Sequence, residues 1–144
     1  MKIKHLNIAK TTFDNISKVK ERLDYSLWID FIDKKKDYFI WVEDTEEGKK
    51  TLSQASKLPE SLRTEYLKGF NKRKVYAEFN TKKGYYDVVI QFNEKLGVIS
   101  TTFQKKIKKH HLELLLKMAN YLDASLLVDG TKIINENTLI DELS

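Results

Sequence analysis

The chain has 144 residues, of which 41% are hydrophobic and 33% charged, and it contains no cysteine. This balance is typical of a globular protein, and the length predicts one domain, residues 1–144, that can bury its own core. The absence of cysteine excludes disulfides, thiolate metal sites and cysteine nucleophiles. No segment is apolar for long enough to span a membrane, and the start lacks the apolar stretch of a secretory signal. We therefore expect a soluble, cytoplasmic protein without a membrane partner.

The net charge of +5 is unevenly distributed along the chain. Residues 70–111 contain ten basic and three acidic side chains, whereas residues 112–144 contain two basic and six acidic ones. Such an asymmetry indicates that the basic segment could form a surface for an anionic partner.

The first 44 residues predict a strand, a helix and a hairpin. Ile3–Ile8 is apolar enough for a short strand, which could lie at a sheet edge and pair between subunits. Apolar residues recur at nearly helical spacing over Phe13–Leu23, which predicts an amphipathic helix. Over Ser26–Asp33 apolar side chains alternate, which predicts a strand. A polar turn at 33–37 then leads to a second strand that starts at Tyr38.

The next segment, Thr45–Gly69, has a helical composition. Pro59 suits the first turn of a helix over Pro59–Lys68, with Leu62 and Tyr66 facing the core. Gly48 weakens a helix that begins at Thr45, so irregular structure is expected near it.

Three strands are predicted after residue 74. Val75, Ala77 and Phe79 occupy alternate positions and are expected on one face of the first strand. A turn over Thr81–Gly84 joins it to a second strand, and Val98–Gln104 forms the third. The result is an antiparallel meander with one apolar face.

Lys105–Ile134 reads as a strongly apolar helix followed by a tight hairpin. Leu115 and Met118 lie near the middle of a broad apolar arc, so this helix should cover the apolar face of the sheet. The Asp129–Gly130 pair between two apolar runs is a strong hairpin signal.

Together these elements predict an α+β fold. An antiparallel sheet of about five to seven strands in hairpins should be packed by an N-terminal helix, a middle helical segment and a dominant helix in the C-terminal half.

The sequence carries no catalytic signature, phosphate loop or metal pattern, so we expect no enzyme activity and no cofactor. His110 and His111 are adjacent on a helix and should point about 100° apart, which predicts that they do not share a metal ion. His111 falls within the apolar arc and reads as a partly buried histidine at a helix start. Asp30, Glu78 and Asp87 are predicted to lie on strands among apolar neighbours, but their spacing selects no catalytic pair.

Lysines gather at one predicted end of the meander, where its first turn and the start of the helix should meet. Basic side chains interleaved with an aromatic one suit nucleic acid, although turn lysines are also ordinary solvated surface. The candidate binding residues are Lys82, Lys83, Tyr85, Lys105, Lys106, Lys108, Lys109 and His111.

The preferred interpretation is a small, non-enzymatic, protein-binding domain. A cysteine-free α+β chain with mixed charge, many aromatic residues and no catalytic motif is typical of toxin-neutralising proteins, such as immunity proteins or inhibitors of bacterial or phage origin. This likeness concerns size and class alone, and no residue role follows from it. The alternative is a nucleic-acid-binding protein that uses the lysine-rich patch. The sequence does not decide the oligomeric state.

Overall fold

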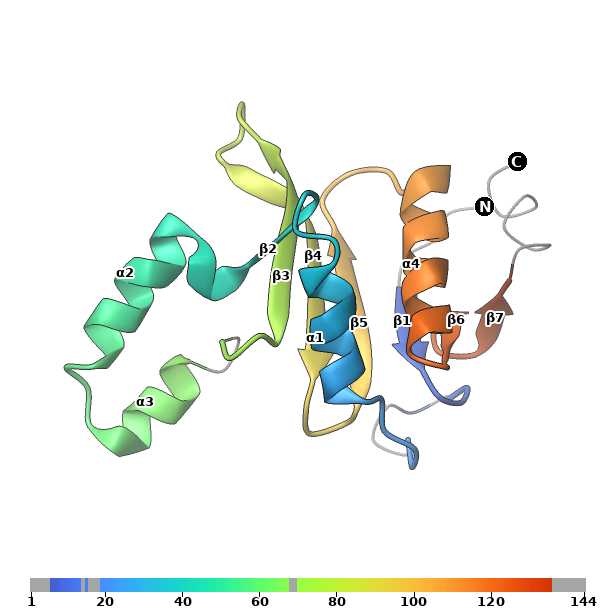
Figure 1. The fold of residues 1–144 in the computed structure, drawn as a ribbon, viewed down its shortest axis with the longest axis horizontal. Helices are drawn as coiled ribbons and strands as arrows, with labels where there is room; N and C mark the ends of the chain where they lie inside the picture. The colour runs from blue at the N-terminus through green and yellow to red at the C-terminus, as the bar shows by residue number, and fades with distance from the viewer. Residues whose placement is uncertain (1–5, 14, 16–18, 68–69, 136–144) are drawn as a thin grey trace.

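The computed structural model describes residues 6–13, 15, 19–67 and 70–135, which form a seven-stranded antiparallel sheet with helices (Figure 1). The strand order is β2-β3-β4-β5-β1-β6-β7. The predicted α+β class is therefore confirmed. The strands are Leu6–Ala9 (β1), Phe39–Trp41 (β2), Lys74–Asn80 (β3), Tyr85–Asn93 (β4), Val98–Phe103 (β5), Ser125–Val128 (β6) and Lys132–Ile134 (β7).

Two helices pack on one face of the sheet, and two extend past its edge (Figure 1). The packed pair is Tyr25–Asp33 (α1) and Lys109–Tyr121 (α4). Beyond β2, a short 3-10 helix at Val42–Asp44 leads to Glu46–Ala55 (α2) and Glu60–Tyr66 (α3). None of the helices in the described part of the chain combines the length and apolar character of a membrane span.

The predicted role of the long C-terminal-half helix is confirmed. Helix α4 buries five side chains against the sheet and α1, including Leu115 and Met118 at 1% and 0% exposure. They meet apolar side chains from the inner face of the central strands, such as Ile8, Ile90 and Leu126. Because the hydrophobic effect scales with buried apolar area, this layer supplies most of the driving force for folding.

The strand predicted at Ser26–Asp33 is wrong, since this segment is helix α1. Asp24 caps the helix by accepting hydrogen bonds from the backbone N–H groups of Ser26 and Leu27. Trp28, Phe31 and Ile32 form its buried face. The segment is apolar at so many positions that it fits both the strand period and the helix period. The N-cap at Asp24 and the burial of one side of the helix decide in favour of the helix.

The N-terminal predictions also need correction. Strand β1 lies between β5 and β6 rather than at an edge, while residues 3–5 fall outside the described residues. Phe13–Leu23 is not helical where the structure describes it. Instead, Phe13 and Val19 pack on a second small cluster of Ala9, Val98 and Leu127, on the sheet face opposite α4. This segment therefore covers part of the outer face.

The middle helical segment is confirmed, with two corrections. Gly48 lies inside α2 rather than in irregular structure, and its N–H is bonded to the Thr45 side chain. A Cβ at this position would lie 1.9 Å from the Val42 carbonyl oxygen, so close packing requires glycine. Leu62 is 57% exposed and does not face the core. The side chain of Tyr66 lies outside what the structure describes.

The predicted meander and the predicted final hairpin agree with the structure. The meander of β3, β4 and β5 is present, and Gly84 in its first turn has a φ of 78°. The hairpin of β6 and β7 turns at Asp129 and Gly130, both with positive φ. Left-handed conformations of this kind favour glycine and tolerate aspartate.

Shortening the core side chains of α4 is expected to destabilise the fold strongly. Leu115→Ala or Met118→Ala should each lower the free energy of unfolding by about 2–5 kcal/mol, because each leaves a cavity in a packed layer. Urea unfolding measures this loss. The exposed Leu62→Ala is the control, and an equal midpoint for the core variants and the wild type would contradict the placement of α4.

Candidate functional site

The alternation of side chains along β3 reverses in the middle of the strand. Ala77 is buried in the core, yet the next residue, Glu78, also points to the helical side, where it contacts Lys105 and His111. Phe79 is consequently turned to the outer face and is 52% exposed, although it was predicted to share a face with Val75. The reversal coincides with a φ of 56° at Glu78, a left-handed conformation in a strand.

Strand β4 reverses at the same level. Val88 pairs with Ala77 and is buried in the core, and the preceding Asp87 lies on the same side, near Lys105. Tyr86 is then directed to the outer face, where its ring stacks on Tyr76. The two matched reversals therefore place carboxylates under the helices and aromatic rings on the opposite surface.

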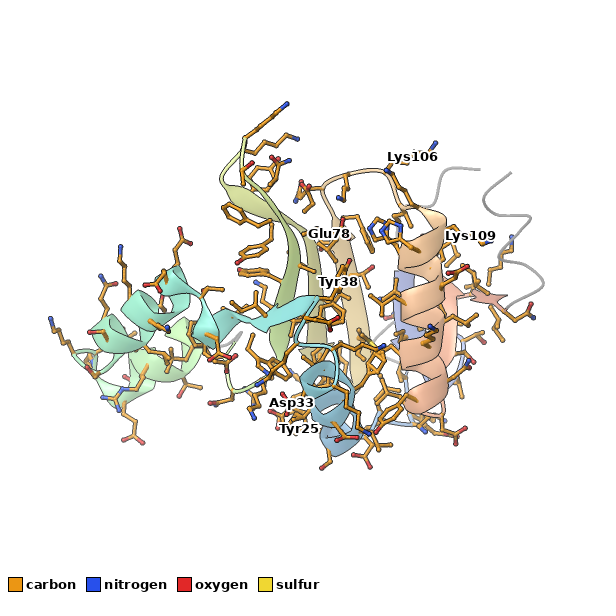
Figure 2. The ribbon with its side chains drawn as sticks, turned by 45° about the horizontal axis from the view of Figure 1, so that its top comes forward. Tyr25, Asp33, Tyr38, Glu78, Lys106 and Lys109 are labelled. Atoms are coloured by element: carbon orange, nitrogen blue, oxygen red, sulfur yellow. The ribbon has the colours of Figure 1, made fainter. Side chains whose placement is uncertain are left out.

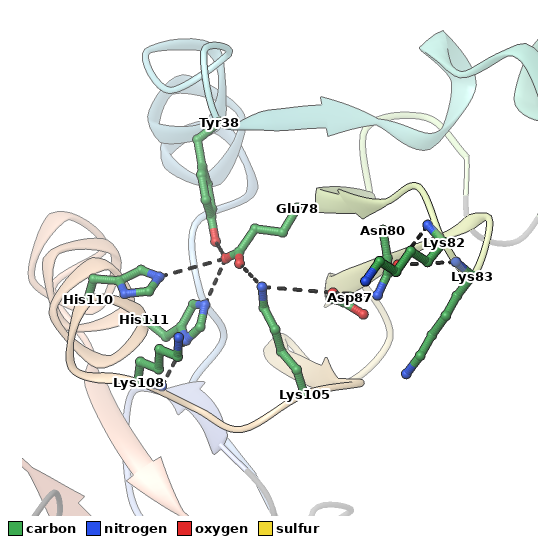
Figure 3. Close-up of polar contacts among 10 residues, drawn as sticks. All are labelled: Tyr38, Glu78, Asn80, Lys82, Lys83, Asp87, Lys105, Lys108, His110 and His111. Carbon is green, nitrogen blue, oxygen red and sulfur yellow. Dashed lines mark hydrogen bonds and ion pairs between the residues drawn. The ribbon is translucent and has the colours of Figure 1, made fainter.

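The carboxylate of Glu78 is the centre of a polar cluster (Figure 3). One oxygen accepts hydrogen bonds from the Tyr38 hydroxyl and from Nε2 of His111, the latter at 2.7 Å. The other oxygen is ion-paired with Nζ of Lys105. Nε2 of His110 lies 3.9 Å from Oε2 of Glu78, the oxygen that His111 contacts. The cluster thereby joins β3 to the loop before β2, the loop after β5 and the first turn of α4.

These contacts change the ionisation of Glu78 and Tyr38. Burial alone would raise the pKa of Glu78, but the hydrogen bonds from Lys105, Tyr38 and His111 outweigh it and lower the pKa to about 2. Burial, followed by the bond to Glu78, raises the pKa of Tyr38 well above its usual 10. At neutral pH the cluster therefore holds an anionic carboxylate and a protonated tyrosine.

Asp87 extends the cluster toward the hairpin between β3 and β4. The residue is 6% exposed, and its Oδ2 lies 3.8 Å from Nζ of Lys105 and 3.4 Å from Nδ2 of Asn80. Its Oδ1 is buried without a hydrogen-bond partner among the described residues. Lys105 thus compensates two carboxylates rather than facing solvent as a free cation.

His111 is fixed as one tautomer by its neighbours. Its Nδ1 accepts a hydrogen bond of 2.9 Å from the backbone N–H of Lys108, at the start of α4. Because Nδ1 is an acceptor, the proton of the neutral ring is on Nε2, which donates to Glu78. Burial, together with the nearby charges of His110 and Lys105, lowers the pKa of His111 despite the opposing effect of Glu78, which favours the neutral ring. The histidine predicted to be partly buried at the helix start is in fact fully buried there, at 1% exposure.

The geometry of the histidine pair differs from the prediction. The rings of His110 and His111 are 4.0 Å apart, and with Glu78 they place three possible ligand atoms within 4.8 Å of one another. A metal ion at this place would need the lone pair of His111 Nε2, which the tautomer occupies with a proton. His110 and Glu78 alone would provide too few ligands for a closed site. The cluster is therefore better suited to holding the fold than to holding a metal.

The other product of the reversal is an aromatic groove on the outer face of β3 and β4, with a volume of about 610 Å³. Tyr76 and Tyr86 stack at 5.0 Å and 14°, and Phe79 meets Tyr86 edge to face. Tyr85, which is 41% exposed, is the first residue of β4 after the hairpin turn and also lines the groove. The start of α2 provides the facing wall. The lining residues are Thr45, Glu46, Glu47, Tyr76, Phe79, Gly84, Tyr85, Tyr86, Val89 and Gln104.

The lysines predicted as a binding surface are brought to one end of the molecule, but they do not act alike. Lys82 and Lys83 lie at the tip of the β3–β4 hairpin, and Lys106 and Lys109 lie at the same end in Figure 2. Lys108, the N-cap residue of α4, is also exposed. Two of the eight candidate residues have other roles, because Lys105 is held by Glu78 and His111 is buried. Lys109 makes a weak, exposed pair with Glu113 at 3.8 Å.

Sequence reasoning missed most of the groove. Tyr85 was a candidate, but Phe79 was expected in the core and Glu46 and Glu47 were read only as helix residues. The density of aromatic residues between 76 and 86 was the available signal. Comparison of the chain with protein-family models, curated proteins and solved structures finds no match, so its function has to be inferred from this geometry.

Glu78 is expected to make the stability of the fold sensitive to acid. Its folded-state pKa of about 2 is below the ordinary 4.5, so its stabilisation is complete above about pH 4.5 and is lost as pH falls toward 2. The loss should be on the order of 2–3 kcal/mol. Urea unfolding of wild type and Glu78→Gln at pH 5.5 and pH 2.5 should give a difference that shrinks on acidification. With Glu113→Gln as control, an unchanged difference would contradict the cluster.

His111 is expected to stay neutral at pH 7, with its proton on Nε2. Long-range proton–nitrogen NMR correlations of the ring distinguish the two tautomers directly. Because that proton blocks the ligand position, addition of Zn²⁺ should leave the unfolding midpoint unchanged. A protonated Nδ1, or a zinc-dependent rise of the midpoint that His111→Gln removes, would show that the cluster is a metal site instead.

Proposed function

We propose that this chain is a non-enzymatic protein-binding domain of the toxin-neutralising type, and that the aromatic groove with its exposed rim is the binding surface. The observation that carries the proposal is the outward placement of Phe79, which is 52% exposed near the end of strand β3. Exposed apolar patches of this kind commonly mark interaction sites, and tyrosine is among the residues enriched at binding hot spots.

The uneven covering of the outer face supports the proposal. Near β1, β5 and β6 that face is covered by the segment that carries Phe13 and Val19. Over β3 and β4, in contrast, four aromatic side chains border an open groove. The left-handed backbone at Glu78 is strained, and it turns aromatic rings toward solvent. Exposure of these rings does not stabilise the fold, which favours a role in recognition.

The proposal predicts binding to one specific protein. We expect the chain to form a complex with a larger, growth-inhibiting protein encoded beside its own gene, and to restore growth when the two are expressed together. Phe79→Asp should weaken binding about ten- to thirtyfold, as loss of a hot-spot side chain does. Isothermal titration measures the affinity.

Leu62→Asp is the matched control for that experiment, since Leu62 is equally exposed but lies on α3 outside the groove. The control should bind and protect like the wild type. If neither a complex nor protection is found with the neighbouring product, the toxin-neutralising proposal fails.

The lysine-rich end keeps nucleic-acid binding as a second candidate, because Lys82, Lys83, Lys106 and Lys108 are exposed there. This alternative predicts retardation of labelled DNA or RNA at low salt. On duplex DNA the affinity should fall with a log–log salt slope of about −0.9 for each phosphate contacted. Lys82→Glu combined with Lys106→Glu should remove the binding. A lack of retardation at low salt eliminates this candidate.

A further inference from the structure

We propose that the groove receives a cationic side chain, preferably an arginine, from a basic protein partner. This inference rests on the proposed protein-binding function and adds the chemistry of the partner. Among the described residues that line the groove, the two charged ones, Glu46 and Glu47, are both acidic. They face a wall of aromatic rings, although the chain as a whole carries a net charge of +5.

Both glutamates lie at the N-terminal end of a helix. Glu46 and Glu47 form the first turn of α2, a ten-residue helix capped by Thr45. The positive end of the helix dipole stabilises negative charge at this position. Glu46 pairs with Lys49 at 3.9 Å, and that pair is largely exposed. Such a pair is weak, so the carboxylate is available to a partner.

The aromatic wall is suited to a cation. Lys74 and Lys83 of the chain itself lie over the rings of Tyr76 and Tyr85, at 5.8 and 5.6 Å from the ring centroids. These contacts are at cation–π distance and show that the rings at the rim present their faces to cations. Neither lysine lines the groove, whose interior therefore has carboxylates and ring surfaces but no basic group of its own among the described residues.

Arginine fits this combination better than other side chains. Its planar guanidinium stacks on an aromatic face and at the same time donates two hydrogen bonds to a carboxylate. The stem of the side chain would be covered by Phe79 and Tyr86. An acidic or phosphorylated segment would instead meet Glu46 and Glu47, which repel it.

The test uses two short peptides that differ at one central position between two leucines, arginine in one and its uncharged isostere citrulline in the other. Each is titrated into the ¹⁵N-labelled full chain at low salt. The arginine peptide should shift the amide signals of Tyr76, Phe79 and Tyr86 and should bind roughly three- to tenfold more tightly than the citrulline peptide. That preference should disappear in the double variant Glu46→Gln, Glu47→Gln.

Glu60→Gln is the control, because Glu60 lies in the first turn of α3, outside the groove. It should keep the preference for arginine. Equal binding of both peptides in the groove overturns the cationic inference but leaves the protein-binding function standing. The inference is also overturned if neither peptide binds, or if sedimentation shows that a second copy of the chain occupies the groove in a dimer that Phe79→Asp dissociates.

Discussion

The left-handed backbone at Glu78 is the constraint on which both surfaces of this protein depend. A non-glycine residue in that conformation within a strand costs about 1–3 kcal/mol and persists only when its surroundings hold it. Here they do: Tyr38, Lys105 and His111 all converge on one carboxylate. The ion pair and hydrogen bonds offset the strain, and they also tie the start of α4 to the sheet.

The same reversal explains why the aromatic face exists. In a regular strand the side chain of residue 79 would point to the same face of the sheet as Ala77, toward the core. Reversing β3 at Glu78 and β4 at Asp87 exchanges the two sides beyond that level. Glu78 and Asp87 therefore lie on the face of the sheet that carries α4, and Phe79 and Tyr86 lie on the opposite face. The polar cluster and the groove are therefore two consequences of one local event.

The lysines are divided by this arrangement. The charge of Lys105 balances Glu78 and Asp87 in the polar cluster, while Lys82 and Lys83 lie at the hairpin tip. The basic surface that is free to bind a partner therefore contains fewer lysines than the sequence suggests. The acidic residues of α2 form a wall beside the aromatic face, so the molecule presents opposite charges on neighbouring surfaces. Electrostatic complementarity of this kind favours selective association with a protein partner.

The sequence by itself determined the elements whose signals are local. The meander follows from alternation, α4 from its broad apolar arc, and the last hairpin from Asp129–Gly130, because each depends on neighbours a few residues apart. Only the tertiary structure decided the rest. Ser26–Asp33 fits two periods, and packing of Trp28 on Trp41 and Phe92 and of Phe31 on Tyr121 selects the helix. The central place of β1 depends on partners about 90 and 120 residues away. The conformation of Glu78 is set by Tyr38, Lys105 and His111, which no local pattern brings together, and so the sequence alone does not predict the polar cluster or the outward placement of Phe79.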